Sequence, residues 1–382
     1  MYRSSHFDPM GWIQWPRNAK LSTEFMRLLG SAQEGGSTVS ECFLSASRID
    51  PNDEESWYRE WKRTADTNAE RGRAASASGN FLTAQNNWLR AINYYGAAAF
   101  NLDDSDDRRR DVLVMERACA QHYLELQTPA GEIVEIPWRD DCSLEGYLFH
   151  AQITRAKSPV VICIAEPGRR KEEFLYKTVR HALSRGISLL AVDLLGSAVD
   201  SKFAQIDDSA CLEVAVNVLI DYLTTREDVD DTRIVIISEG ACSSFVTRAA
   251  AHDHRLAAVV CDGGIWDLHE IPSRALRAAP ARPTNNARNL RCPVLITIGE
   301  HGWLDTSSVL QLFDQLRTNE TDISLRIFEA TETAASQGHV DNPTLANEYI
   351  FDWIAGRLAN NCVLRAEPRL SDPKRVMGGD AS

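Results

Sequence analysis

Six titratable side chains in the second half of the chain could move protons during a reaction: Glu239, Glu300, His301, Asp305, His339 and Asp341. A histidine or carboxylate in an apolar cleft can have its pKa tuned toward neutrality, and it then speeds proton transfer by about 10²- to 10⁴-fold without any nucleophile. Each also has an ordinary structural explanation: Asp341 as a helix cap, Glu300 as a loop residue, His301 as a solvent-exposed side chain. The group therefore indicates acid–base chemistry without identifying which member performs it.

The composition narrows the kinds of ligand that such groups could serve. The net charge of −13 argues against nucleic acid, because binding to phosphates needs clustered Lys and Arg. No stretch approaches the roughly 20 apolar residues of a membrane span, and the start of the chain lacks the pattern of a signal peptide, so we expect a cytoplasmic protein. Nine scattered cysteines indicate neither a disulfide framework nor a metal site, and no phosphate loop or dinucleotide motif occurs. We therefore expect no metal and no cofactor.

The first part of the chain is predicted to be helical. From Glu54 to about Ala120 apolar residues recur at helical spacing, and Gly79-Asn80 separates two helical stretches. Steps of four and three residues place one group of side chains on a single stripe, for which core packing is the simpler explanation: Ala84, Trp88, Ala91, Tyr95 and Ala98.

After Thr128 the pattern changes to short β-rich runs that alternate with amphipathic stretches, as in a sheet with crossover helices. The predicted strands are Ile133 to Trp138, Leu144 to His150, Pro159 to Ala165, Ile187 to Asp193, Arg233 to Ile237, Ala257 to Cys261, Pro293 to Gly299 and Ile323 to Phe328. The first two are expected to form an antiparallel hairpin and the others to be buried and parallel. The predicted helices between them are Lys171 to Ser184, Cys211 to Thr225, Ser243 to Ala251, Ser307 to Arg317 and Leu345 to Leu358.

This order of elements predicts an α/β-hydrolase fold with an eight-stranded, mostly parallel sheet in residues 129–364. Residues 1–128 are expected to form an N-terminal α-helical lid domain. Residues 365–382 contain two prolines and two glycines and are expected to be a disordered tail.

Several motifs between Gly79 and Trp353 resemble those of one hydrolase family. They are Asn87-Trp88-Leu89-Arg90-Ala91-Ile92-Asn93-Tyr94-Tyr95, Arg248-Ala249-Ala250-Ala251 with Arg255 and Gly263-Gly264, Gly299-Glu300, and Val340-Asp341-Asn342 leading to Ile350-Phe351-Asp352-Trp353. The chain resembles the helical-lid carbon–carbon and ester hydrolases that include 2,6-dihydroxypseudooxynicotine hydrolase and fungal enzymes that process polyketides. The resemblance implies a pocket between lid and core.

The resemblance also implies where a Ser-His-Asp triad would lie, and the three slots hold other residues. The nucleophile of such a fold sits on a strained strand-to-helix turn, and counts from Arg233 and from Arg248 both place this slot on Gly240. The slot of the acid, two residues after Glu300, holds Gly302. The slot of the histidine holds Gln337, although His339 lies close enough for a shifted loop to present it. These slots are therefore expected to be degenerate.

The turn expected to bind an oxyanion also departs from the family. It reads Glu166-Pro167-Gly168-Arg169, in which proline lacks a backbone donor. A carboxylate at Glu166 would repel an oxyanion unless it were protonated or paired with Arg169 or Arg170. Ser238, Cys242 and Ser243 flank the turn and could replace the nucleophile only if one of them pointed into the pocket.

Aromatic side chains are expected to contact an apolar substrate. Tyr94, Tyr95 and Trp88 lie on the helix that faces the pocket in the family, and Trp266 and Trp303 lie on loops at predicted strand ends. Tyr94, which is one position off the alanine stripe, is the better candidate. Glu166 and Arg169 are expected to lie at the same pocket.

We therefore expect an enzyme of fungal secondary metabolism that acts on a hydrophobic polyketide-like substrate by cyclisation, dehydration or aldol-type chemistry. His339 would move the proton together with a carboxylate such as Glu239 or Asp305, and His301 is a further candidate. Two alternatives stay open: a non-catalytic partner of an active hydrolase, and a hydrolase with a displaced nucleophile. Relatives of this type suggest a possible homodimer.

Overall fold

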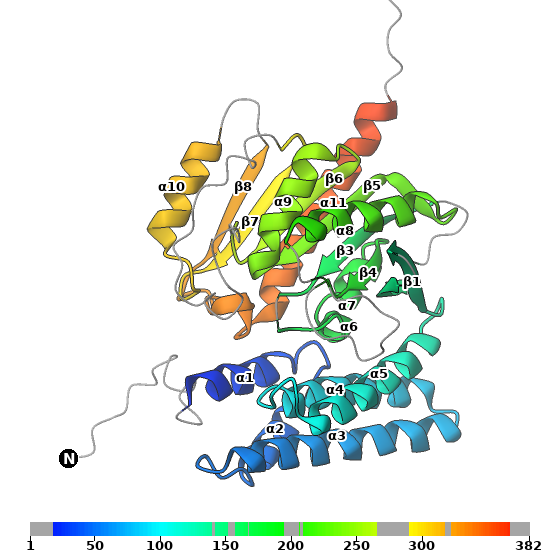
Figure 1. The fold of residues 1–382 in the computed structure, drawn as a ribbon, viewed down its shortest axis with the longest axis vertical. Coiled ribbons are helices and arrows are strands. Elements are labelled where there is room, and N and C mark those ends of the chain that lie inside the picture. Colours follow the sequence, from blue (N-terminus) through cyan, green and yellow to red (C-terminus); the bar gives the residue numbers. More distant parts are fainter. Residues whose placement is uncertain are drawn as a thin grey trace, which may run out of the picture.

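The chain folds into a layer of helices beneath a mixed sheet that carries helices on both of its faces (Figure 1). The computed structural model describes residues 18–139, 142–151, 157–166, 168–194, 206, 209–265, 290–317 and 322–366. Within these residues no helix has the length and apolar character that crossing a membrane requires.

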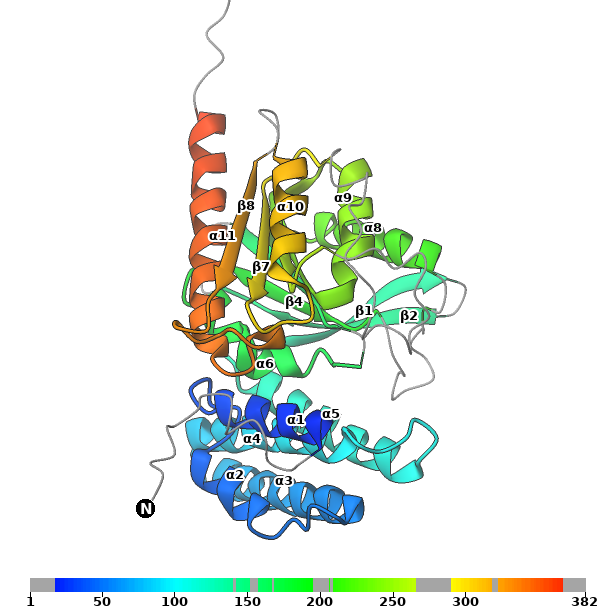
Figure 2. The ribbon, with the colours of Figure 1, turned by 90° about the vertical axis from the view of Figure 1, so that its left-hand side faces the viewer.

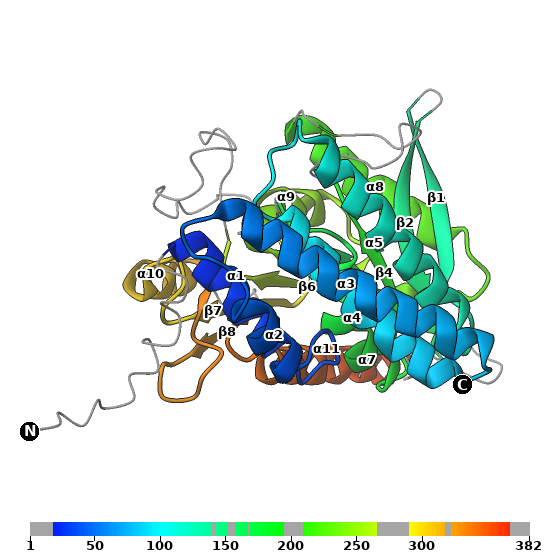
Figure 3. The same ribbon diagram turned by 90° about the horizontal axis from the view of Figure 1, so that it is seen from below.

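The helical layer, as we call it, consists of α1 (Ala19–Gly30), α2 (Val39–Ala46), α3 (Glu54–Ala77), α4 (Phe81–Ala99) and α5 (Asp107–Glu125). The side chains of Asn18, Thr38, Asp53 and Asp106 accept hydrogen bonds from the first free backbone N–H groups of α1, α2, α3 and α5. Gly79, with a φ of +74°, lies in the turn between α3 and α4, where the sequence predicted a break. Seen from below, this layer lies across the end of the sheet (Figure 3).

The predicted stripe on α4 is buried, as expected for core packing. Its five side chains are at most 4% exposed. Tyr94, which lies one position off the stripe, is also fully buried, because α3 and α5 enclose α4 from both sides. Its ring stacks on Trp61 with centroids 5.7 Å apart.

The sheet confirms the predicted α/β-hydrolase fold. Its strands are β1 (Glu132–Arg139), β2 (Cys142–Phe149), β3 (Ser158–Ile164), β4 (Ser188–Val192), β5 (Val229–Glu239), β6 (Leu256–Asp262), β7 (Val294–Gly299) and β8 (Ile323–Phe328), in the order β1-β2-β4-β3-β5-β6-β7-β8. The first two form the expected antiparallel hairpin, and β4, β3 and β5 to β8 run parallel. Because parallel strands end at one edge, the residues that follow β3, β5 and β6 come together there.

Helices cover both faces of the sheet (Figure 2). One face packs against α8 (Ser209–Thr224), α9 (Ser243–His252) and α10 (Thr306–Leu316), and the other against α11 (Pro343–Ala366). The single helix predicted from Lys171 to Ser184 is wrong: it is divided into α6 (Glu173–Lys177) and α7 (Val179–Leu183). Thr178, with a φ of −126°, leaves the helical conformation between them.

The chain end differs slightly from expectation. Helix α11 continues to Ala366, past the predicted start of the tail at residue 365. The remainder of the predicted tail lies outside the described residues.

Candidate active site

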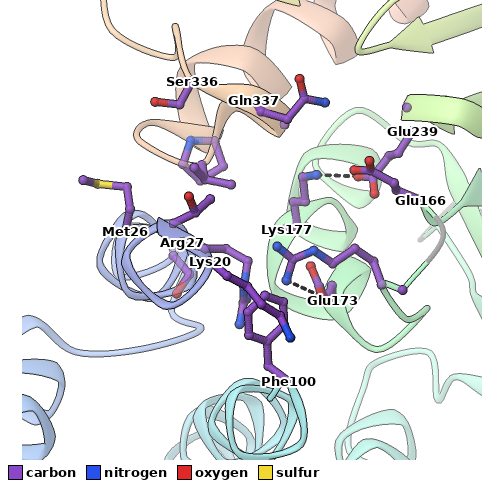
Figure 4. Close-up of a pocket in the computed structure, with 18 of the residues that line it drawn as sticks. Lys20, Met26, Arg27, Phe100, Glu166, Glu173, Lys177, Glu239, Ser336 and Gln337 are labelled. Atoms are coloured by element: carbon purple, nitrogen blue, oxygen red, sulfur yellow. Dashed lines mark hydrogen bonds and ion pairs between the residues drawn. The ribbon is translucent and has the colours of Figure 1, made fainter. Parts of the chain in front are cut away.

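A cavity of about 720 Å³ lies between α1 of the helical layer and the carboxyl ends of β3, β5 and β6 (Figure 4). Its apolar lining includes Met26, Phe100, Leu102, Val340 and Trp303. Charged side chains from five parts of the fold face the same space: Arg27 on α1, Glu166 and Arg169 after β3, Glu173 and Lys177 on α6, Glu239 at the end of β5, and Asp262 at the end of β6. A cavity at this edge of a parallel sheet is where ligands of α/β proteins bind.

Gly240 stands at the sharp turn between β5 and α9. Its φ is +50°, and a short 3₁₀ turn, Gly240–Cys242, leads directly into the helix. Strand, sharp turn and helix in this order form the geometry that raises a nucleophile above the sheet in this fold, and the turn occurs at the residue that the two sequence counts selected. A Cβ atom at Gly240 would lie 2.9 Å from Cδ of Glu166. The Glu166 carboxyl group therefore fills the space above the turn.

The Glu166 carboxyl group is buried without a cation that pairs directly with it among the described residues. Burial raises its pKa to about 7, the carboxylates of Glu239 and Asp262 add to the effect, and Arg169 and Lys177 oppose it. Among the described residues Glu166 forms no ion pair. The two arginines that were considered as partners for it form ion pairs elsewhere: Arg169 with Glu24 and Glu173, and Arg170 with Glu116 and Glu172. Near neutral pH both forms of the Glu166 carboxyl group are populated.

Glu239 forms an ion pair with Lys177, so the predicted catalytic carboxylate is not free. Burial raises the pKa of Glu239, and Lys177 opposes this. Burial alone would lower the pKa of the Lys177 ammonium, but Glu239 and Asp262 raise it above its usual range. Lys177 was not predicted as a site residue, because it belongs to no motif and lies inside a predicted helix.

Asp262, which lines the cavity, forms a buried ion pair with His339, which does not. His339 Nε2 lies 2.9 Å from Asp262 Oδ1. Burial would raise the pKa of Asp262, but His339 lowers it to about 2, and burial would lower the pKa of His339, but Asp262 raises it. Thr297 Oγ1 also donates a hydrogen bond to Asp262 Oδ1 over 2.8 Å.

The other ring nitrogen fixes the protonation state of His339. Nδ1 lies 2.6 Å from the carbonyl oxygen of Ala334, which can only accept, so Nδ1 carries a hydrogen. Nε2 faces an ionised carboxylate and therefore also carries one. Asp262 thus favours the imidazolium form, in which neither ring nitrogen has a lone pair, and the ring is 2% exposed and does not line the cavity. The prediction that His339 reaches the substrate as a base is thus not supported by its position.

Gln337, in the predicted histidine slot, does line the cavity. Its Oε1 accepts a hydrogen bond from the backbone N–H of Trp303 over 2.9 Å, and a Cβ atom at Gly302 would lie 3.1 Å from that oxygen. The predicted slots Gly302 and Gln337 are therefore neighbours. Gly338 and His339 have φ values of +62° and +54°, and this turn points Gln337 into the cavity and His339 away from it.

Other predicted site residues lie elsewhere. Tyr94 donates its hydroxyl to Glu41 over 3.0 Å, Tyr95 donates to Asp66 over 2.7 Å, and Trp88 stacks on His122; none of them lines the cavity, because α4 packs inside the helical layer. Asp305 caps α10 at the surface by accepting from the N–H of Ser308. His301 and Trp303 are exposed at the rim of the cavity, and Trp266 lies outside the described residues.

The three candidate substitute nucleophiles are buried and turned away from the cavity. Ser238 Oγ donates to the carbonyl oxygen of Val260, Cys242 Sγ to that of Ala165, and Ser243 Oγ to that of Gly240. Burial also raises the pKa of Cys242, which disfavours its thiolate. In the part of the chain that the structure describes, no group of three potential metal ligands occurs.

We expect Gly240→Ser to lower the free energy of unfolding by about 1–3 kcal/mol, because the new Cβ atom would crowd the Glu166 carboxyl group. Adding Glu166→Ala should restore the part of the loss that comes from crowding, since it empties that space. The part that comes from the φ of +50°, which residues with a Cβ atom rarely adopt, should remain. Urea unfolding of both single variants and the double variant gives the coupling between the two positions. Additive losses would show that Glu166 does not occupy the space above the turn.

The fold and the sharp turn after β5 define a protein of the α/β-hydrolase class with a helical lid. A family model described as "FrsA-like: Esterase FrsA-like" matches residues 52–281, and the chain belongs to this family. The resemblance inferred from the sequence motifs is confirmed.

Curated relatives come from fungi. The chain is 31% identical over 260 residues to "Alpha/beta hydrolase xenA" of Xenoacremonium sinensis, covering 65% of this chain and 60% of that protein. It is 29% identical over 259 residues to "20-hydroxy-prefusarin hydrolase FUS2" of Gibberella moniliformis, covering 65% and 61%. The chain thus spans about three fifths of the length of these relatives.

Solved structures show the same fold at low sequence identity. The 2,6-dihydroxy-pseudo-oxynicotine hydrolase has a TM-score of 0.69 at 18% identity and covers 87% of this chain and 96% of its own. "AbyA5 Wildtype" has a TM-score of 0.61 at 17% identity and covers 90% and 99%. These similarities establish the architecture alone.

Proposed function

We propose that this chain is an enzyme of fungal secondary metabolism that acts on a hydrophobic, polyketide-like substrate without a covalent intermediate. Cyclisation, dehydration and aldol-type bond formation are the reactions that such a site can perform. The observation that carries the proposal is the Glu166 carboxyl group, which fills the space above Gly240 where a nucleophile would stand. The fungal α/β-hydrolase relatives support the biological setting.

The proton-transfer role passes to Glu166 in this proposal. His339 has no lone pair to offer, Glu239 is paired with Lys177, and Asp305 lies outside the cavity. A carboxyl group that titrates near pH 7 can accept a proton in one step and return it in the next. The cavity walls would hold a flexible substrate in a reactive conformation. Holding reacting groups in the right orientation lowers the activation barrier of a reaction by several kcal/mol, and by about 7–11 kcal/mol at most.

Active-site probes test the absence of a covalent intermediate. We expect a fluorophosphonate and, separately, iodoacetamide to leave residues 238–243 unmodified, because no hydroxyl or thiol of this segment faces the cavity. Intact-protein mass spectrometry followed by peptide mapping measures the adducts, and a serine hydrolase of the same fold serves as positive control. A burst of p-nitrophenol from p-nitrophenyl esters, or an adduct in this segment, would establish a displaced nucleophile and refute the proposal.

Exposed apolar side chains favour one alternative, a non-catalytic binding protein. Val39, Phe43 and Leu44 on α2 are 53%, 57% and 52% exposed, and together they could contact a partner hydrolase or a second copy of the chain. This alternative predicts that the cavity binds a ligand without converting it. Light scattering of the wild type and of Phe43→Ser would show whether α2 contributes to an assembly.

A further inference from the structure

We propose that Glu166 and Lys177 form an enolisation site for ketones that carry an acidic hydrogen next to the carbonyl carbon. Glu166 removes this hydrogen as a proton, and the Lys177 ammonium stabilises the oxygen that becomes negative. The inference rests on the proposed function and names the substrate class and the first chemical step of that site.

The carboxylate has the position that a base requires. It lies above the turn at Gly240, at the carboxyl edge of the sheet, with its Oε1 atom 3.0 Å from the place that a Cβ atom would take. No side chain among the described residues forms an ion pair with it, so an approaching substrate does not have to displace a cation. The charged groups that act on it come from every surrounding element: Arg169 from its own loop, Lys177 from α6, Glu239 from β5 and Asp262 from β6.

The ammonium group has the position that an oxyanion partner requires. Lys177 lines the same cavity, and its side chain points toward the carboxyl groups of Glu239 and Glu166 (Figure 4). Its Nζ has three N–H donors, of which Glu239 takes one. The ion pair with Glu239 fixes the ammonium group and keeps it protonated, so it remains a cation rather than an amine nucleophile.

The step balances without any co-reactant. The C–H bond beside the carbonyl breaks, the proton goes to a Glu166 oxygen, and the electron pair forms the C=C bond of an enolate whose oxygen accepts a hydrogen bond from Lys177. Glu166 then returns a proton to the same carbon, or the enolate carbon forms a new bond to an electrophilic carbon within a folded substrate. Both outcomes start from the same enolate, so hydrogen exchange reports the step even when no product forms.

Hydrogen–deuterium exchange of phenylacetone in D₂O tests this inference. We expect the full chain to increase the rate at which the benzylic CH₂ signal disappears from the proton NMR spectrum, relative to buffer alone. The catalysed rate should rise with pH through about 7, as Glu166 loses its proton, and then level off. Glu166→Gln should lower the catalysed rate by about 10²- to 10⁴-fold.

Two further variants separate the role of Lys177 from loss of folding. Lys177→Met combined with Glu239→Gln removes both charges of the pair, so no buried charge is left alone, and it should lower the rate by about 10²-fold. Asp305→Asn changes a carboxylate outside the cavity, retains a capping side chain for α10, and should leave the exchange rate unchanged. Circular dichroism confirms that each variant is folded.

The outcomes distinguish this inference from the proposed function. No exchange by the wild type, or equal rates for the wild type and a folded Glu166→Gln variant, would overturn the enolisation site. The proposed function would fail in a different experiment, through a covalent adduct or an ester burst. An exchange rate in the folded Lys177→Met/Glu239→Gln variant equal to that of the wild type would overturn the role of Lys177.

Discussion

His339→Ala is expected to lower the free energy of unfolding at pH 7 by about 3–5 kcal/mol, although the imidazole does not reach the cavity. The substitution leaves the Asp262 carboxylate, which is 5% exposed, with Thr297 as its remaining described hydrogen-bond donor. Leaving one buried charge without its partner lowers the free energy of unfolding by far more than the intact pair raised it. Urea unfolding, followed by tryptophan fluorescence, measures the loss.

A double variant provides the control. Asp262→Asn together with His339→Ala removes both charges, so it should be more stable than His339→Ala alone, while additive losses would contradict the ion pair. The pH dependence follows from the two pKa shifts. The pKa of Asp262 is lowered from 3.8 to about 2, so its contribution is present above about pH 4 and is lost as the pH falls toward 2. The pKa of His339 is raised from 6.5, so its contribution is complete below 6.5 and is lost as the pH rises through the folded value.

The fold was predictable because its signals are local and repeated. Each buried strand is a short apolar run bounded by turn residues, and their alternation with helices admits few topologies. The break at Thr178, where one continuous helix was predicted, could not be read from such local signals. Apolar periodicity continues across the break between α6 and α7, so the sequence pattern alone does not reveal that this residue leaves the helical conformation.

The site was predictable in part, through distance along the chain. Gly240 was located because the residue after a buried strand must lie at the edge of the sheet, and Gln337 was located by its spacing to later motifs. The structure places Tyr94 away from the cavity, although the sequence made it the better candidate for contacting a substrate. A position one step off an apolar stripe faces outward only when a single neighbour covers the helix, whereas α3 and α5 cover α4 from two sides.

The pairing of charges was beyond prediction. Lys177 and Glu239 are 62 residues apart in the sequence, and His339 and Asp262 are 77 residues apart. Neither contact produces a periodic pattern in the sequence. Asp262 could have been suspected, since it directly follows the predicted strand that ends at Cys261. Glu166 was noted at the cavity, but its proximity to Gly240 depends on the register between β3 and β5.

A second buried cluster, between the helical layer and the sheet, should make stability depend on pH. Glu116 on α5 is 2% exposed and pairs with Arg170, which also contacts Glu172. Burial raises the pKa of Glu116 to about 8; Glu172 raises it further, and Arg170 opposes this. At a pH between the pKa of the unfolded chain and the higher pKa of the folded chain, such a carboxyl group is protonated in the folded chain and ionised in the unfolded one. Stability is therefore highest below about pH 4.5 for this group and is lost as the pH rises toward 8.

Glu116→Gln is expected to leave stability at pH 4 close to that of the wild type and to raise it at pH 9 by about 3–5 kcal/mol. Glutamine keeps an acceptor for Arg170 Nε, now 2.9 Å from Glu116 Oε2, and never ionises. Urea unfolding of both chains at the two pH values gives the difference directly, and titration of other groups cancels in it. Glu125→Gln, at the exposed end of the same helix, controls for a general change of charge. If Glu116→Gln gained no more at pH 9 than Glu125→Gln does, the pKa of Glu116 would not be raised in the folded chain, because Arg170 would fully compensate its charge.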